Sequence, residues 1–189
     1  MQISKTRIDG LLLIEPDVYP DERGYFFEHY NTSRYERVGL AAAFVQDNCS
    51  FSRQGTIRGL HYQVGSHAQG KLTSVLYGKV RDVAVDIRFG SPTFGAHVAV
   101  ELSDENHLQF WIPPGFAHGF SVLSETVVLT YKCTAYYSKR HERSIRFDDP
   151  DLAIDWRVAR PIVSERDQIA PDLRSIERDF VFDGGPASI

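Results

Sequence analysis

The sequence VRDVAVDI at residues 80–87 decides the fold class. In an extended chain its Val and Ile residues at odd positions lie on one face, while Asp82 and Asp86 lie on the other, which is the alternation of a β-strand. Further segments that favour strands follow at residues 98–100, 108–112, 120–123 and 127–131, at the spacing of a β-sandwich or barrel. Strands do not alternate with helices here, so we predict an all-β fold.

Length and composition indicate one ordinary globular domain over residues 1–189, long enough to bury a substantial core. The formal net charge of −4 gives no reason to expect nucleic acid or a membrane surface as partner. The sequence shows neither a signal-like start nor an apolar stretch of membrane-spanning length. Cys49 and Cys133 are too few for a disulfide framework, so we expect reduced thiols in a cytoplasmic protein.

The two ends of the chain have different patterns from the middle. Residues 11–14 predict a brief strand, and residues 21–28 predict a charged turn that leads into an aromatic strand. Residues 33–38 predict a helix, with Ser33 and Glu36 spaced as a capping box and Gly39 at its end. A second short helix is expected to begin near Ser164, and we expect weak order from about residue 176 and a mobile Gly-Gly-Pro-Ala-Ser at 184–188.

The sequence IRGLHYQ at residues 57–63, followed by GKL at 70–72, is the first candidate for a functional site. In an extended chain His61 shares a face with Gly59 and Gln63, so it belongs to a polar lining. Arg58 and Lys71 suit a bound anion, and Gly59 permits close approach of backbone or ligand. A titratable imidazole beside anion-binding groups indicates proton transfer on a phosphorylated substrate.

The sequence PPGFAHG at residues 113–119 resembles the second motif of cupins, small β-barrels that often carry a metal. In that motif the histidine, here His118, supplies one metal ligand. The first cupin motif needs His-x-His, whereas the matching place reads His61-Tyr62-Gln63. One ligand is missing, so we predict no metal site and expect His61 and His118 to act as acid, base or hydrogen-bond donor.

Several longer motifs together resemble the dTDP-4-dehydrorhamnose 3,5-epimerase family of metal-free cupin-fold sugar-nucleotide epimerases. The resemblance runs in order from about residue 3 to 175, and its main motifs are RGLHYQ at 58–63, GKL at 70–72, DVAVDIR at 82–88, SPTFG at 91–95, WIPPGFAHGF at 111–120 and YKCT at 131–134. It implies a jelly-roll β-sandwich with short peripheral helices, a homodimer that exchanges N-terminal strands, and a dTDP-4-keto-6-deoxyhexose substrate.

The residue types suit that chemistry. In a 4-keto sugar the hydrogens at C3 and C5 flank a carbonyl, so removing either gives an enolate that can be reprotonated on its other face without a cofactor. Histidine titrates near ~6.5, far below a carbon acid, and each unit of pKa mismatch costs about 1.36 kcal/mol. A base alone is therefore insufficient, and donors aimed at the enolate oxygen must supply much of the difference.

The resemblance implies a role for each site residue. His61 is the base, Asp167 orients its imidazole, Tyr131 is the acid, and Lys71 faces the enolate oxygen. The remaining implied substrate contacts are Arg23, Glu28, Gln46, Asn48, Arg58, His118, Glu142 and Arg166, with Tyr137 stacking on the thymine. Arginine suits these positions because its planar fork grips diphosphate oxygens in pairs.

Two departures from the family pattern and three alternatives remain open at this point. Arg166 stands where lysine is commoner, and Cys49 stands where histidine or another polar residue is expected, which bears on substrate specificity. The alternatives are an enzyme of the same fold that inverts only one carbon, a non-catalytic sugar-nucleotide-binding cupin, and a metal-dependent cupin. Local structure also offers simpler interpretations, in which Asp167 only begins a helix capped by Ser164, Tyr131 packs in the core and His118 sits in a turn.

Overall fold

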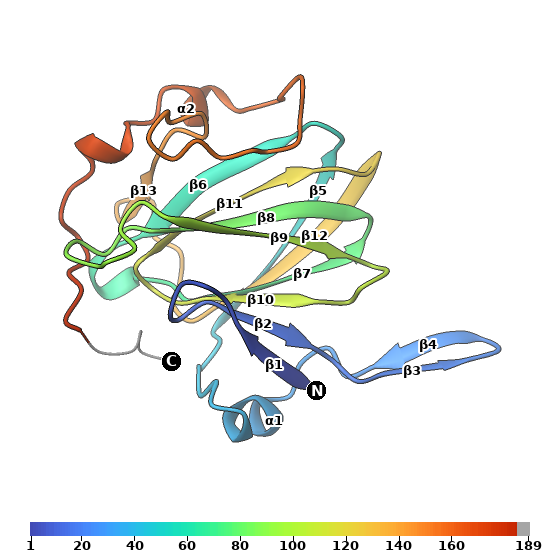
Figure 1. Ribbon diagram of the computed structural model, residues 1–189. Helices are drawn as coiled ribbons and strands as arrows, with labels where there is room; N and C mark the ends of the chain where they lie inside the picture. The colour runs from blue at the N-terminus through green and yellow to red at the C-terminus, as the bar shows by residue number, and fades with distance from the viewer. Residues whose placement is uncertain (185–189) are drawn as a thin grey trace.

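The computed structural model describes residues 1–184 and shows two antiparallel sheets packed face to face (Figure 1). The order in the first sheet is β1 (Gln2–Lys5), β2 (Leu12–Glu15), β10 (Gln109–Ile112), β7 (Lys71–Tyr77), β12 (Thr126–Cys133) and β5 (Gln46–Arg53). The order in the second is β13 (Glu142–Ser144), β6 (Ile57–Gln63), β11 (Phe116–Val122), β8 (Lys79–Asp86) and β9 (His97–Ser103). The predicted all-β sandwich with short peripheral helices is confirmed.

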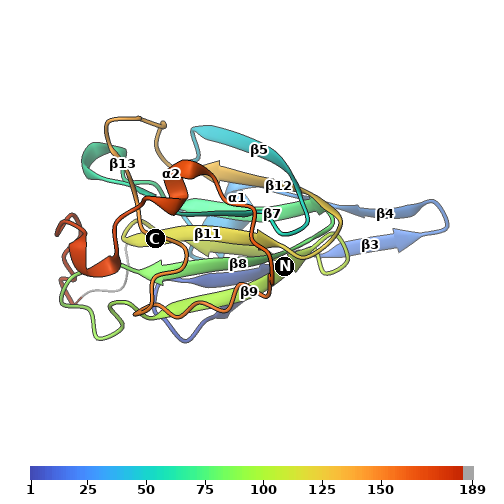
Figure 2. The ribbon, with the colours of Figure 1, turned by 90° about the horizontal axis from the view of Figure 1, so that it is seen from above.

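The predicted strand at 80–87 is β8, and its two faces serve two cores. Val80 and Ala84 pack between the sheets, whereas Val83 and Val85 pack outward against the C-terminal segment. That segment includes α2 (Glu165–Gln168) and the 3₁₀ turn Leu173–Ser175, and it runs across the outer side of the second sheet (Figure 2). Burial on both faces explains the run of small branched residues in this strand.

The chain ends depart from the sequence-based expectations in two places. Helix α1 covers Thr32–Arg37, and Asn31 caps it by accepting from the Arg34 amide, so the capping box predicted at Ser33 is wrong. The amide of Phe89 donates to the carbonyl of Phe180, so this part of the tail packs on the body although weak order was expected from about residue 176. The start of α2 after Ser164 is confirmed, while residues 185–188 of the expected mobile end lie outside the described residues.

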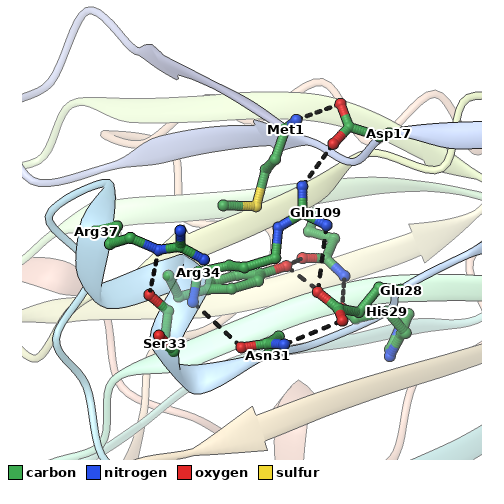
Figure 3. A network of polar contacts seen from close by, with 10 residues as sticks. Met1, Asp17, Glu28, His29, Asn31, Ser33, Arg34, Arg37 and Gln109 are labelled. Carbon is green, nitrogen blue, oxygen red and sulfur yellow. Dashed lines mark hydrogen bonds and ion pairs between the residues drawn. The ribbon is translucent and has the colours of Figure 1, made fainter.

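A two-stranded arm, β3 (Val18–Asp21) and β4 (Gly24–Phe27), projects from the sandwich in both views (Figures 1 and 2). It carries exposed aromatic side chains at Tyr19, Tyr25 and Phe26. Its base is tied to the body through Arg34, which binds Asp17 and Glu28 (Figure 3). The predicted charged turn at 21–24 is therefore the tip of a solvent-exposed hairpin.

Two glycines bring β6 and β11 unusually close together. A Cβ at Gly59 would lie 2.5 Å from the Gly119 Cα, and a Cβ at Gly119 would lie 2.8 Å from the Arg58 carbonyl oxygen. Only glycine permits this approach. It places His61 and His118, which are register partners, side by side on neighbouring strands.

Within residues 1–184 there is no helix that is both long and apolar enough to cross a membrane.

Candidate active site

A cavity of about 550 Å³ lies between the two sheets, and a second of about 270 Å³ adjoins it. His61, Lys71 and Tyr131 line both cavities and so mark their junction. His61 comes from β6 in the five-stranded sheet, whereas Lys71 and Tyr131 come from β7 and β12 in the six-stranded sheet. A ligand at the junction therefore meets a candidate base on one wall and a candidate acid on the other.

The imidazole of His61 is held by Asp167, whose Oδ1 lies 2.6 Å from His61 Nε2. Asp167 is buried, and its other oxygen faces the Gly59 amide at 3.5 Å. Burial alone raises the pKa of Asp167, but the hydrogen bonds from His61 and Ser164 outweigh it and hold the pKa below its ordinary value. An ionised carboxylate only accepts, so Nε2 carries the hydrogen and Nδ1 is left to take a proton.

Asp167 combines the two roles that the sequence left open. Its amide donates to the Ser164 side chain, which caps α2, and its carboxylate orients His61. The cap fixes the helix, and the helix fixes the carboxylate. Asp167 therefore makes both the contact of a helix start and a hydrogen bond to the His61 imidazole.

Tyr131 is half-buried at the junction of the cavities. Burial, with nearby Cys133, raises the pKa of its hydroxyl, although Arg58 acts in the opposite direction. The phenol therefore keeps its proton at neutral pH, as an acid must.

Lys71 is buried, and its Nζ lies 5.8 Å from the centre of the Tyr131 ring. Burial lowers the pKa of this lysine, while Cys133, Asp82 and Glu142 act to raise it. Buried lysine without a close carboxylate is costly to the fold, so its position indicates a functional demand for positive charge at the junction.

His118 forms a second imidazole and carboxylate pair that the sequence analysis missed. Its Nε2 lies 2.9 Å from Oδ1 of Asp82, which is fully buried on β8. The other oxygen of Asp82 is buried without a hydrogen-bond partner among the described residues. The alternation at 80–87, which puts Asp82 on one face of the strand, was the available signal, because a buried carboxylate needs a donor.

Strand β5 supplies a polar stripe along the cavities. Gln46 and Asn48 line the smaller cavity and bond to each other at 3.0 Å, and Ser50 lines the larger one. Ser52 accepts from Nε of Arg58, which also lines the larger cavity. The two serines escaped the sequence analysis, although they continue the alternation that starts at Gln46.

Three further predicted residues form one hydrogen-bonded group at the rim. Oε2 of Glu142 accepts from the Tyr137 hydroxyl at 2.7 Å and from Nη1 of Arg166 at 2.6 Å. Burial acts to raise the pKa of Glu142, but Arg166 and Tyr137 outweigh it and lower the pKa. Tyr137 and Glu142 line the smaller cavity and Arg166 lines the larger one.

Arg23 and Glu28 do not join the other predicted site residues within this chain. Arg23 lies at the exposed tip of the arm and binds Asp21, and neither it nor Glu28 lines either cavity. The carboxylate of Glu28 contacts Asn31 and Arg34 at the base of the arm (Figure 3). Within one chain, these two predicted residues are therefore separate from the cavities.

Residues 1–184 contain no group of three or more His, Cys, Asp or Glu side chains arranged to hold a metal ion. Cys49 and Cys133 are both free thiols, the first exposed and the second buried.

Comparison with known proteins gives one consistent relationship. Residues 5–175 match the family model for dTDP-4-dehydrorhamnose 3,5-epimerase. The chain is 51% identical over 168 residues to the dTDP-4-dehydrorhamnose 3,5-epimerase of Shigella flexneri, covering 88% of this chain and 93% of that protein.

Solved structures agree with the sequence relationship. The dTDP-6-deoxy-D-glucose-3,5-epimerase of Legionella pneumophila, crystallised with dTDP-4-keto-L-rhamnose, is 52% identical with a TM-score of 0.92, covering 96% of this chain and 98% of that one. A 3′-monoepimerase of Streptomyces bikiniensis, crystallised with dTDP-quinovose, is 32% identical with a TM-score of 0.86, covering 92% of this chain and 88% of that one.

The substitution Lys71→Met tests whether the lysine is kept for chemistry at a cost to stability. Because the folded chain lowers the pKa of Lys71, it binds this proton less tightly than the unfolded chain does. The destabilisation caused by burying the charged lysine is fully present below the pKa of Lys71 in the folded chain. It disappears as the pH rises from there through the ordinary pKa of lysine. We expect Lys71→Met to increase the free energy of unfolding at pH 7 by about 1 kcal/mol and to abolish turnover.

Urea unfolding at pH 7 and at pH 10 measures the free energy of unfolding of Lys71→Met and of the wild type, with the exposed lysine variant Lys139→Met as control. The increase in the free energy of unfolding caused by Lys71→Met is expected to be smaller at pH 10 than at pH 7. A loss of stability at pH 7 would contradict the assignment of Lys71 as an uncompensated buried cation.

Proposed function

We propose that this chain, which belongs to the dTDP-4-dehydrorhamnose 3,5-epimerase family, inverts C3 and C5 of dTDP-4-keto-6-deoxy-D-glucose in rhamnose-type deoxysugar biosynthesis. One observation carries the proposal. The imidazole of His61 and the phenol of Tyr131 reach one cavity from opposite sheets. Inversion requires that a proton leave one face of a carbon and that another arrive on the opposite face, which this arrangement provides.

The first step breaks a C–H bond next to the ketone. Nδ1 of His61 takes the proton, and the Asp167 carboxylate stabilises the imidazolium that forms. The electron pair moves onto the carbonyl oxygen, and Lys71 and His118, which Asp82 holds, line the same cavity and stabilise the enolate.

The second step forms a C–H bond on the other face. The Tyr131 hydroxyl gives its proton to the enolate carbon, and solvent restores the phenol and removes the proton from His61. The reaction is an isomerisation, so it balances without an oxidant or a reductant. The same two groups serve C3 and C5, since both carbons flank one carbonyl.

The nucleotide half of the substrate has suitable partners near the junction. Tyr137 is half-exposed and offers an aromatic face to a base, and Arg58 and Arg166 offer guanidinium forks to a diphosphate. The relatives crystallised with dTDP-sugars support dTDP as the nucleotide. The higher identity to double epimerases than to the 3′-monoepimerase favours inversion at two carbons.

Proton NMR of dTDP-4-keto-6-deoxy-D-glucose incubated with the protein in D₂O tests the proposal. We expect deuterium at both C3 and C5 and an L-configured product that a 4-keto reductase can trap. His61→Asn is the control and is expected to retain dTDP binding without exchange. Label at one carbon alone would indicate the single-centre enzyme, and no label would contradict the proposed reaction.

The arm supports the further proposal of a homodimer that exchanges N-terminal strands. It presents exposed aromatic side chains, and exposed Phe51, Leu76 and Tyr77 lie on strands β5 and β7 of the six-stranded sheet. A single exposed apolar residue needs no explanation. Two groups of them on one chain fit an interface in which the arm of each chain packs on the sheet of the other. Arg23 would then enter the cavity of the second chain.

Mixed dimers test this exchange, because Arg23→Ala and His61→Ala chains complement only if the arm acts in trans. Each variant alone is expected to be inactive. Mixed after unfolding and refolding in equal amounts, they are expected to recover about a quarter of wild-type activity, since half of the dimers are mixed and each holds one intact site. No recovery, with mixed dimers shown by mass spectrometry, would place Arg23 in its own chain's site or outside any site.

A further inference from the structure

The group formed by Tyr137, Glu142 and Arg166, here called the rim clasp, spans the two cavities. Glu142 uses one oxygen, Oε2, for both partners, so its position and theirs are fixed together. Its side chain is only 12% exposed, while that of Arg166 is 50% exposed. The carboxylate is therefore more buried than Arg166, and the clasp has members on both cavities.

Two of the three clasp residues lie on backbone that is held by regular secondary structure. Glu142 pairs with Gln63 in the ladder between β13 and β6, two residues from His61. Arg166 immediately precedes Asp167 on α2, whose start is capped by Ser164. The clasp thus links β13, which pairs with the strand that carries His61, to α2, which carries Asp167.

Arg166 keeps much of its hydrogen-bonding capacity. A guanidinium has five N–H donors in one plane, and among the described residues Nη1 alone is engaged, by Glu142. The edge formed by Nε and Nη2 suits a pair of phosphate oxygens. A lysine at this position would have a single ammonium nitrogen to share between Glu142 and the ligand. An arginine can bind Glu142 with one nitrogen and the ligand with the others.

We propose that Glu142 is a positioning residue that couples recognition of the base to recognition of the diphosphate. This rests on the proposed function and deepens it. Glu142 holds the Tyr137 ring and the free edge of Arg166 at a fixed separation, so a nucleoside diphosphate that engages one finds the other in place.

The hydrogen bonds that orient the base lie outside the clasp. The Asp167 carboxylate is held by His61, and its backbone by the Ser164 cap, so neither depends on the clasp. Loss of the clasp should therefore weaken ligand binding and raise KM by a larger factor than it lowers kcat.

Calorimetric titration with dTDP measures the coupling. We expect Glu142→Gln to weaken dTDP binding roughly tenfold, because it replaces a charge-assisted hydrogen bond by a neutral one. Tyr137→Phe keeps the ring and removes only the hydroxyl, and it is expected to weaken binding about threefold. The control is Asp148→Asn, which removes an exposed carboxylate paired with Arg146 outside both cavities and should leave dTDP binding unchanged.

A mutant cycle separates coupling from simple contact. The effects of Tyr137→Phe and Arg166→Lys on dTDP binding are expected to be non-additive in the wild type, by about threefold, and additive when Glu142→Gln is also present. If Glu142→Gln does not fold, the first cycle still decides. Additive effects in the wild type, or a fall in kcat at unchanged KM, would overturn the proposal.

The same titrations keep this inference separate from the proposed function. If the wild type binds dTDP without epimerising the keto sugar, the proposed function is wrong, but the mutant cycle still tests whether Glu142 couples Tyr137 to Arg166. If the wild type epimerises the sugar and Glu142→Gln binds dTDP as tightly as the wild type does, the inference fails alone. No binding of dTDP by the wild type would overturn both.

Discussion

The hydrogen bond between His61 and Asp167 is the contact on which the site depends. It joins β6 to a four-residue helix more than a hundred positions later in the chain, and it selects which imidazole nitrogen is free. The helix is in place because the C-terminal segment packs Leu152 and Trp156 onto the outer face of the second sheet. Apolar burial on the outside of the sandwich therefore holds in place the carboxylate that orients the base inside it.

The inward-facing residues of the six-stranded sheet fall into two groups, one that packs in the core and one that lies toward the cavities. Across β7, β12 and β5, one row of register partners is Val75, Leu129 and Ser50, which is mostly apolar and belongs with the main core. The next rows toward the cavity junction are Thr73, Tyr131 and Asn48, then Lys71, Cys133 and Gln46. Polar groups replace core residues along this half of the sheet, at a cost in desolvation that only a ligand or a reaction requires.

Much of this could be predicted from the sequence where the signal is local. Alternation at 80–87 predicts a strand, and the motif at 57–63 predicts an inward histidine, because each depends on a few neighbours. The resemblance to a known family named His61, Lys71, Tyr131, His118 and Asp167, and the structure places all five around one cavity.

The rest depends on register and on partners that a single sequence does not display. The Asp82–His118 bond follows from how β8 pairs with β11, and the Ser33 cap failed because Asn31 reaches the Arg34 amide from two residues earlier. Arg23 and Glu28 lie outside both cavities of this chain. The family resemblance thus named residues that share one cavity, whereas non-local pairing determined the contacts that support them.

The central claim is that base and acid act from opposite walls, and the most direct measurement compares deuterium exchange with inversion in Tyr131→Phe. If the phenol is the acid, His61 should still remove protons, so exchange at C3 and C5 should persist within about tenfold of wild type, while net inversion falls by about a hundredfold or more. An equal fall in exchange and inversion would contradict the assignment of Tyr131 as the acid of the opposite wall.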